Sequence, residues 1–535
     1  MDTLKTNVLY YGDNLEILRK YIPENSIDLI YLDPPFSSKK DYNIIFKEAT
    51  GELSAAQIKA FSDTWHWDKA AEDTFQDITL NAPPKVAKLI DAIIGGLGRN
   101  DVTAYLVMMA IRLVELHRVL KDTGSIYLHC DPTASHYLKM VLDQVFGPRN
   151  FRNEIVWKRF NFHADARRFG RVSDRLLFYT KTPQFTWNVQ TRPFDEKYVE
   201  SHFTYKDSHG RLFRLDNLNP PGGRGPIYEF HGFTRPWRYT EEKMLKLERQ
   251  GRIHVEPGKV PSIKRYLHEI PGAAVFDIWT DIFPINSQAK ERLGYQTQKP
   301  LALLERIIQA SSNEGDIILD PFCGCGTALV EAQKHNRKWI GIDITHLAIA
   351  VMKSRLEESF PGIQFEVIGE PEDLAGAKAL AKEDRYQFQW WALSLIKAKP
   401  FPEERRKGAD KGIDGVIDFQ DRDEVTGKPA MRRAVVSVKS GHVHVKDIRE
   451  LKDIASRHAM GVFITLELPT KEMRTEAVSA GFYHSPLWDR DYAKVQILTI
   501  EELLQGKPVD MPPATSPYAK APKISKKEGK QLAME

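Results

Sequence analysis

The chain has little cysteine, no long apolar run and no strong excess of either charge, and each shortage excludes a class of protein. Its 535 residues include 3 cysteines, too few for the disulfide framework of a small secreted domain, so a reducing cytoplasm is expected. No apolar stretch approaches the roughly 18 residues of a membrane-spanning helix, and no signal-peptide core follows Met1. With 42% hydrophobic and 28% charged residues, the composition predicts an ordinary folded chain.

The small net charge of +4 hides a basic segment in the middle of the chain. Positions 150–270 hold 23 Lys and Arg against 14 Asp and Glu, together with 20 of the 55 Phe, Tyr and Trp residues. Cations that meet phosphates, interleaved with rings that stack on bases, are typical of a nucleic-acid surface. The alternative is an irregular insertion whose aromatic residues fill a small core of their own.

The segments on either side show the alternation of an α/β protein. Apolar runs predict strands over 26–32, 124–129, 316–319 and 338–342, and amphipathic or apolar segments predict helices over 103–120 and 327–335. This spacing predicts a Rossmann-like, doubly wound parallel sheet that the basic segment interrupts. We expect a catalytic domain over 1–149 and 296–370, an insertion over 150–295, a linker over 371–399, a second α/β domain over 400–507 and a disordered basic tail over 508–535.

The first chemical motif is the loop Asp320-Pro321-Phe322-Cys323-Gly324-Cys325-Gly326-Thr327, between a predicted strand and a predicted helix. Glycines let the backbone approach a ligand closely, and the helix that follows offers free amides to an anionic group. Asp343 ends the next strand, where an acid can bind ribose hydroxyls. A dinucleotide fingerprint requires glycine at the position of Leu329, so NAD binding is disfavoured.

The second motif, Asp33-Pro34-Pro35-Phe36, follows the strand predicted over 26–32. It places a carboxylate, a carbonyl held rigid by two prolines and an aromatic ring at the sheet edge where ligands bind. Asp33 and the Pro34 carbonyl suit the two N–H bonds of an exocyclic amine, and Phe36 suits stacking on its ring. The alternative is a proline turn with no chemical role.

Together these motifs resemble those of the β group of DNA amino-methyltransferases, which modify adenine N6 or cytosine N4. The catalytic tetrapeptide precedes the target-recognition region and the cofactor loop, as in that group, and Thr297-Gln298-Lys299-Pro300 resembles its segment before the loop. Further segments resemble the family at Tyr11-Gly12-Asp13, His129-Cys130-Asp131 and Phe151–Trp157.

The resemblance implies base flipping on double-stranded DNA, with S-adenosyl-L-methionine as the cofactor, and homodimers are common in the family. It assigns catalysis to Asp33, Pro34, Pro35 and Phe36. It assigns cofactor binding to Asp13, Lys299, Pro300, Asp320, Pro321, Phe322, Gly324, Gly326, Thr327 and Asp343.

The resemblance also favours adenine over cytosine, because Asp in the first position of the tetrapeptide accompanies adenine more often than N4-cytosine. Phe36 replaces the more usual Tyr but keeps a stacking face. Methyltransferases that act on protein glutamine or RNA usually have Asn first and the cofactor loop earlier in the chain. A DNA-binding protein without catalysis is disfavoured by the intact Asp33, Gly324, Gly326 and Asp343.

The pair Cys323 and Cys325 raises the question of a zinc site. Two cysteines need further ligands to hold zinc, and none is evident in the neighbouring sequence. We therefore expect both to be small residues of the loop.

The second α/β domain resembles Mrr-like restriction endonuclease domains of the PD-(D/E)xK type. Asp414 and Lys439 match that motif, but Ser437 stands where the family has an acidic residue or Gln, and a hydroxyl is a poor Mg²⁺ ligand. Glu403 or Glu404 could supply the missing carboxylate. An active Mg²⁺ nuclease with Asp414 as metal ligand, which would make a bifunctional restriction-modification enzyme, a degenerate DNA-binding module and a structural appendage all stay open.

Overall fold

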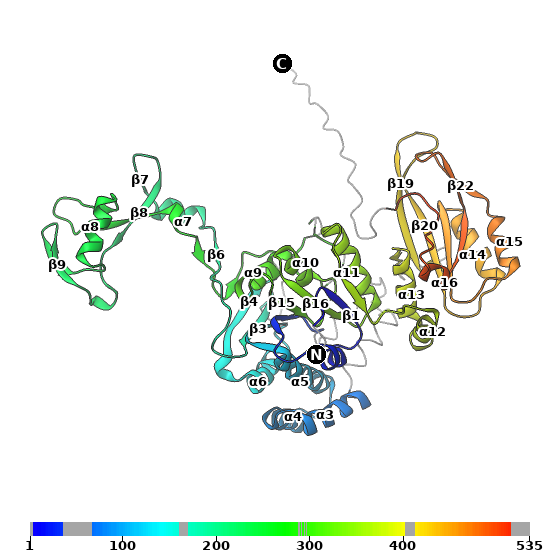
Figure 1. The fold of residues 1–535 in the computed structure, drawn as a ribbon, viewed down its shortest axis with the longest axis horizontal. Helices are drawn as coiled ribbons and strands as arrows, with labels where there is room; N and C mark the ends of the chain where they lie inside the picture. The colour runs from blue at the N-terminus through cyan, green and yellow to red at the C-terminus, as the bar shows by residue number, and fades with distance from the viewer. Residues whose placement is uncertain are drawn as a thin grey trace, which may run out of the picture. The chain divides into compact units, whose positions relative to one another are not determined.

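The part of the chain from β1 to β17 is built on one large mixed sheet (Figure 1). The computed structural model describes residues 4–35, 67–159, 169–286, 289, 291–293, 295, 297–401 and 412–514. The nine strands stand in the order β14-β4-β5-β3-β2-β15-β16-β1-β17. Their bounds are β14 Ile278–Trp279, β4 Phe151–Lys158, β5 Ser173–Thr180, β3 Leu120–Cys130, β2 Ile27–Leu32, β15 Ile317–Asp320, β16 Lys338–Asp343, β1 Val8–Tyr11 and β17 Glu366–Ile368.

The centre of this sheet is parallel, as the strand and helix spacing predicts. β2, β15, β16 and β1 run parallel to their neighbours, whereas β5 is antiparallel to both β3 and β4. β2 is buried along almost its whole length, which is the pattern of a strand covered on both faces. The predicted α/β class is confirmed, with an antiparallel extension that the sequence pattern did not reveal.

Helices cover the sheet in two groups, which Figure 1 shows on opposite sides of it. The first group consists of α1 Asn14–Tyr21, α3 Lys69–Asn81, α4 Pro84–Leu97, α5 Asp101–Val119 and α6 Ser135–Phe146. The second consists of α9 Leu301–Ser311, α10 Thr327–Lys334 and α11 His346–Ser359. α5 is buried nearly all round because α1, α3, α4 and α6 all pack against it, which explains its largely apolar sequence. Within the described residues, no helix is both long and apolar enough to cross a membrane.

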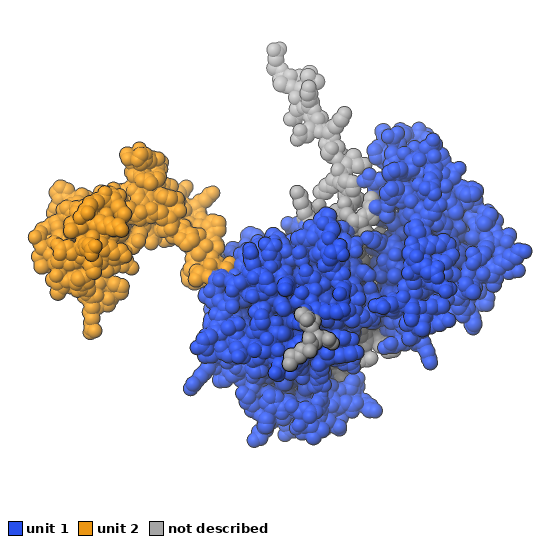
Figure 2. Space-filling model, in the orientation of Figure 1, with its two compact units in different colours: residues 1–188, 277–535 blue, residues 189–276 orange. Residues whose placement is uncertain are grey.

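Residues 189–276 form a separate compact unit, drawn in orange in Figure 2. It contains β6 Thr191–Arg192, α7 Glu196–His202, β7 Tyr205–Lys206, β8 Leu212–Asn217, β9 Ile227–Phe230, β10 Phe233–Pro236, α8 Glu241–Arg249, β11 Ile253–His254, β12 Ser262–Tyr266 and β13 Ala273–Ala274. Trp237 and Phe230 are buried with Met244 in its core, so part of the aromatic excess fills a core, as the alternative interpretation holds. The compact insertion is narrower than the 150–295 expected, because β4, β5 and β14 are strands of the main sheet.

The C-terminal region is a second α/β domain, built on a five-stranded sheet with the order β18-β19-β20-β21-β24. Its elements are β18 Lys399–Pro400, β19 Gly415–Arg422, β20 Pro429–Lys439, α14 Val445–Ala455, β21 Met460–Thr465, α15 Lys471–Val478, β22 Phe482–Ser485, β23 Arg490–Ala493, β24 Val495–Thr499 and α16 Ile500–Leu504. The expected linker contains α12 Leu374–Glu383 and α13 Arg385–Leu395, whose Phe388 and Trp391 are buried in the core of this domain. Of the expected tail, residues 508–514 are described, and Val509 and Met511 pack against the same core.

Candidate functional site

The carboxyl ends of three adjacent parallel strands bring the two predicted motifs together. Asp33 follows β2, Asp320 ends β15 and Asp343 ends β16, and these strands are neighbours in the sheet. Their register pairs Leu319 with Ile30. In an open α/β sheet this edge is where ligands bind. Pro34 and Pro35 lie beside Asp33, whereas Phe36 lies outside the described residues.

Asp33 has two oxygens in different situations. Its Oδ2 accepts a hydrogen bond from the ammonium of Lys299, a residue 266 positions away in the sequence. Its Oδ1 is buried and has no hydrogen-bond partner among the residues that the structure describes. A buried polar atom without a partner is costly and usually marks a functional position. Within the described residues, Asp33 is therefore paired through Oδ2 and keeps Oδ1 as a buried acceptor without a donor.

The cofactor loop is held by backbone contacts to its own sheet. The Gly324 N–H donates to Asp343 Oδ2 over 2.9 Å, and the Cys323 N–H donates to the Ile342 carbonyl over 3.1 Å. Gly324 and Gly326 have φ angles of 50° and 71°, a region that favours glycine. A Cβ at Gly326 would come within 2.8 Å of the Met352 side chain, so this turn also requires the absence of a side chain.

Three further contacts fix the ends of this loop. The Pro321 carbonyl accepts from Asn14 Nδ2 over 2.8 Å, and the Phe322 N–H donates to Asp320 Oδ1 over 3.1 Å. Thr327 Oγ1, at the start of α10, accepts from Arg355 Nη1 over 3.1 Å. The loop is thus prearranged, which lowers the entropic cost of binding a ligand.

Two largely buried acidic side chains line the cofactor loop. Burial raises the pKa of Asp320 well above its usual range, and the like charges of Asp33 and Asp343 raise it further. Burial also raises the pKa of Asp343, although hydrogen bonds from Thr345 and from the Gly324 N–H oppose the shift. A ligand that carries a positive charge would stabilise the ionised forms of both groups. The residues present therefore fit S-adenosylmethionine, whose sulfonium and ammonium groups are cationic.

Asp13 and Pro300, two further predicted cofactor residues, both lie at the start of a helix. Asp13 caps α1 through a 2.7 Å bond from the Leu15 N–H to Oδ1, and its Oδ2 accepts from Arg112 Nη2 at 2.5 Å. Pro300 is the residue before the first turn of α9. Both residues lie near the site, but the described contacts of Asp13 are those of a structural residue.

Cys323 and Cys325 are free, buried thiols of the loop. Cys323 Sγ donates to the Ile342 carbonyl over 3.0 Å, and burial raises the pKa of both thiols. Neither belongs to a group of metal-ligand side chains within the described part of the chain. Both cysteines are thus buried residues of the loop, and Cys323 ties it to the end of β16.

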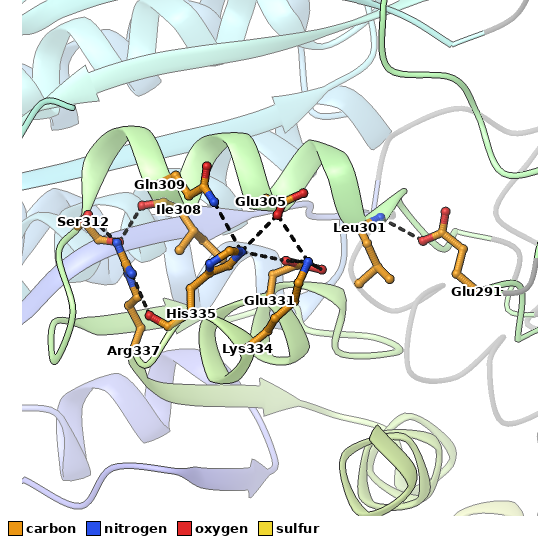
Figure 3. Close-up of polar contacts among 10 residues, drawn as sticks. All are labelled: Glu291, Leu301, Glu305, Ile308, Gln309, Ser312, Glu331, Lys334, His335 and Arg337. Atoms are coloured by element: carbon orange, nitrogen blue, oxygen red, sulfur yellow. Dashed lines mark hydrogen bonds and ion pairs between the residues drawn. The ribbon is translucent and has the colours of Figure 1, made fainter. Parts of the chain in front are cut away.

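The helices that follow the two cofactor segments are joined by a polar cluster (Figure 3). Glu305 of α9 accepts from His335 over 3.2 Å and from Lys334 over 3.3 Å, and Lys334 also pairs with the fully buried Glu331. The ligand atoms of Glu305, Glu331 and His335 lie within 4.8 Å of one another, but the Lys334 ammonium pairs with both carboxylates. The cluster thus connects α9 to the C-terminal end of α10.

Sequence reasoning named His129 but missed the buried network it belongs to, and it missed the position of Tyr295. Tyr31, two residues before Asp33, shares a 3.0 Å hydrogen bond with His129 Nδ1, and His129 Nε2 lies 3.1 Å from Asp174 Oδ2. The tyrosine ring of Tyr295 lies 3.3 Å from where a Cβ of Gly324 would be, and covers that turn. The only sequence signal for that network is the pattern that puts Tyr31 and Asp33 on one face of a strand.

Within the described part of the C-terminal domain, the nuclease-like residues belong to no group of metal-ligand side chains. Asp414 Oδ2 accepts from the Val438 N–H over 2.7 Å and from Ser437 Oγ over 3.5 Å. Lys439 Nζ is 3.9 Å from Asp447 of α14. One carboxylate and one hydroxyl do not fit a Mg²⁺ ion, which binds through carboxylates and water. Glu403 and Glu404 lie outside the described residues.

Comparisons with known proteins agree with this arrangement. The profile of a DNA methylase family that covers N6 and N4 enzymes matches residues 27–354, and the profile described as NACHT-associated inactive Restriction Endonuclease 1 matches residues 394–505. The chain is 32% identical to Type II methyltransferase M.EcaI of Enterobacter cloacae over 359 residues, which cover 66% of this chain and 69% of that protein.

Two more relatives are more distant. DNA adenine methyltransferase YhdJ of Escherichia coli strain K12 is 24% identical over 66% of this chain and 83% of its own length. Among solved structures, the cytosine-N4-specific PvuII DNA methyltransferase is 14% identical, with a TM-score of 0.31, over 67% of this chain and 88% of its own.

Proposed function

The chain belongs to the N6/N4 family of DNA methylases, and from this premise we propose that it transfers a methyl group from S-adenosylmethionine to N6 of a flipped adenine in double-stranded DNA. The observation that carries the proposal is the buried Oδ1 of Asp33, which has no hydrogen-bond partner among the described residues and lies at the same sheet edge as the cofactor loop. A carboxylate oxygen there can accept an N–H from an exocyclic amine. A base must leave the duplex to reach it, since a stacked base cannot present its amino group to a buried carboxylate.

The chain's own groups supply orientation and charge. S-adenosylmethionine supplies an electrophilic methyl group when it is bound. Asp33 Oδ1 and the Pro34 carbonyl each accept one N–H of the amine, which holds the nitrogen lone pair toward the methyl carbon. With the cofactor bound, the amine nitrogen would gain the methyl group and a positive charge, and the C–S bond electrons would remain with the departing thioether. The carboxylate of Asp33 stabilises that charge and accepts the proton that the nitrogen then releases.

We assign cofactor binding to residues at the same edge of the sheet. Asp320, Pro321, Phe322, Gly324, Gly326 and Thr327 form the loop, and Asp343 lies at the next strand end, where it suits the ribose. Adenine is favoured over cytosine because the tetrapeptide begins with Asp33. Single-molecule sequencing of DNA from cells that express the protein tests this directly, because it identifies the modified base and its context. N4-methylcytosine in place of N6-methyladenine would overturn the choice of base and leave the transfer reaction intact.

We further propose that the C-terminal domain does not cleave DNA. The support is the donor set, because Asp414 is engaged by the Val438 N–H and Ser437 replaces a carboxylate. The description of the matched domain family as inactive agrees with this proposal.

With free Mg²⁺ in excess, the purified full-length protein is expected to leave plasmid DNA uncut in every methylation state. Because the described residues offer no complete Mg²⁺ ligand set, Lys439→Ala should not alter this result. Gel electrophoresis of unmethylated, hemimethylated and fully methylated plasmid is the measurement. Cleavage by the native chain that Lys439→Ala abolishes would show an active nuclease.

A further inference from the structure

We propose that Lys299 is a positioning residue for methyl transfer, which holds Oδ2 of Asp33 so that Oδ1 faces the amino group of the target base. The inference rests on the proposed function and changes the role of Lys299, which the family resemblance assigns to the cofactor. Its basis is that the Lys299 ammonium meets the catalytic carboxylate itself rather than a group of the cofactor loop.

The backbone of Lys299 is anchored where the three motifs meet. Its carbonyl accepts a hydrogen bond from Thr327 Oγ1, the first residue of α10, over 3.4 Å. Pro300 follows directly and is the N-cap of α9, which the polar cluster of Figure 3 ties to α10. The side chain then reaches Asp33, with 12% of its surface exposed against 15% for the Asp33 side chain. A movement of either helix start would therefore move the catalytic carboxylate.

The charges around Asp33 explain why it needs this partner. The groups whose pKa is raised by the charge of Asp33 come from five different segments, and they are Tyr31, Tyr105, Cys130, Tyr295 and Asp320. None of them is a cation. The Lys299 ammonium, in contrast, lowers the pKa of Asp320 and of Asp174. The Lys299 ammonium is thus a cation in direct contact with the largely buried Asp33 carboxylate, among acidic and phenolic groups.

The two oxygens of Asp33 thus have separate roles. A carboxylate with both oxygens free would rotate about its Cβ–Cγ bond, and its acceptor direction would be undefined. The contact with Lys299 fixes Oδ2 and leaves Oδ1 as the acceptor, so the geometry is set before the base arrives. Prearranged charge of this kind is what accelerates a reaction that needs no covalent intermediate.

The experiment compares four full-length proteins, namely the native chain, Lys299→Met, Lys299→Arg and the control Lys121→Met. Lys121 pairs with Asp28 over 2.8 Å, and Asp28 lies at the other end of β2, so the control removes a lysine–aspartate pair from the same strand far from the site. The dissociation constant of S-adenosylmethionine is measured by calorimetry. Single-turnover methyl transfer to plasmid DNA is measured with tritiated S-adenosylmethionine at saturation.

We expect Lys299→Met to lower the transfer rate constant by about 100-fold or more, with the dissociation constant changed by less than about 3-fold. Lys299→Arg should recover the rate to within about 10-fold, because its guanidinium keeps the charge and the contact. Lys121→Met should transfer at the native rate. Thermal unfolding of each protein identifies a loss of fold, and if Lys299→Met is unfolded, Lys299→Gln replaces it in the same comparison.

Three results would overturn the inference. A weaker dissociation constant with normal transfer at saturation would place Lys299 on the cofactor. Equal losses in Lys299→Met and Lys121→Met would show a general effect on the sheet. A native chain that binds S-adenosylmethionine but methylates no DNA would overturn the proposed function, and this inference with it.

Discussion

Replacing Asp33 with alanine is expected to lower methyl transfer by about 1,000-fold or more and to leave binding of S-adenosylmethionine within about 10-fold of the native value. The substitution removes the acceptor for the amine N–H, the charge that stabilises the methylated nitrogen and the group that takes its proton. The cofactor loop keeps its own contacts to Asp343, Ile342 and Asn14, so the binding surface for the cofactor persists.

Asp33→Asn keeps the size of the side chain and removes its charge. The Lys299 ammonium only donates, so it would hold the amide oxygen and turn the amide NH2, also a donor, toward the base amine. We expect transfer as low as in Asp33→Ala, measured with tritiated donor at saturation. Equal losses of transfer and of cofactor affinity in Asp33→Ala would instead make Asp33 a cofactor residue.

The sequence predicted the positions that depend on short-range patterns. Asp33, Asp320 and Asp343 each follow an apolar strand, and the parallel topology then brings them to one edge of the sheet, as the structure confirms. The turn at Gly326 was also foreseeable, because a positive φ directly before a helix favours glycine. These features need only local propensity and a known rule of sheet topology.

Contacts between distant side chains could not be predicted in the same way. Lys299 and Asp33 are 266 residues apart, and no periodicity relates them. The packing of helix α13 could not be predicted either, because two consecutive residues of this helix pack in different hydrophobic clusters. Trp391 is buried in the core of the C-terminal domain, whereas Trp390 packs with Cys325 of the cofactor loop and Leu347 of α11. An aromatic cluster in the sequence does not reveal which ring faces which partner, so this segment was expected to be a linker.

Replacing Arg112 with methionine is expected to destabilise the catalytic domain by about 3 kcal/mol, near the lower end of the range for a broken buried ion pair. Arg112 is 8% exposed, and its guanidinium donates to Asn14 Oδ1 over 2.6 Å and to Asp13 Oδ2 at 2.5 Å. Methionine fills a similar volume but leaves both acceptors without their donor. The Asp13 side chain is 35% exposed, so water can hydrate part of its charge and limit the cost.

This loss should reach the cofactor loop, because Asn14 uses its other end to hold it. Asn14 Nδ2 donates to the Pro321 carbonyl over 2.8 Å, so α5, the start of α1 and the loop form one buried chain of contacts. Hydrogen exchange is the suitable measurement, since a chain with two domains need not unfold in one step. Amides of α1 and α5 are expected to exchange about 100-fold faster in Arg112→Met, since 1.4 kcal/mol corresponds to a factor of ten. Arg99→Met is the control, because the Arg99–Glu72 pair is exposed and worth at most about 1 kcal/mol. Equal acceleration in both variants would show that the buried chain adds nothing beyond an ordinary surface pair.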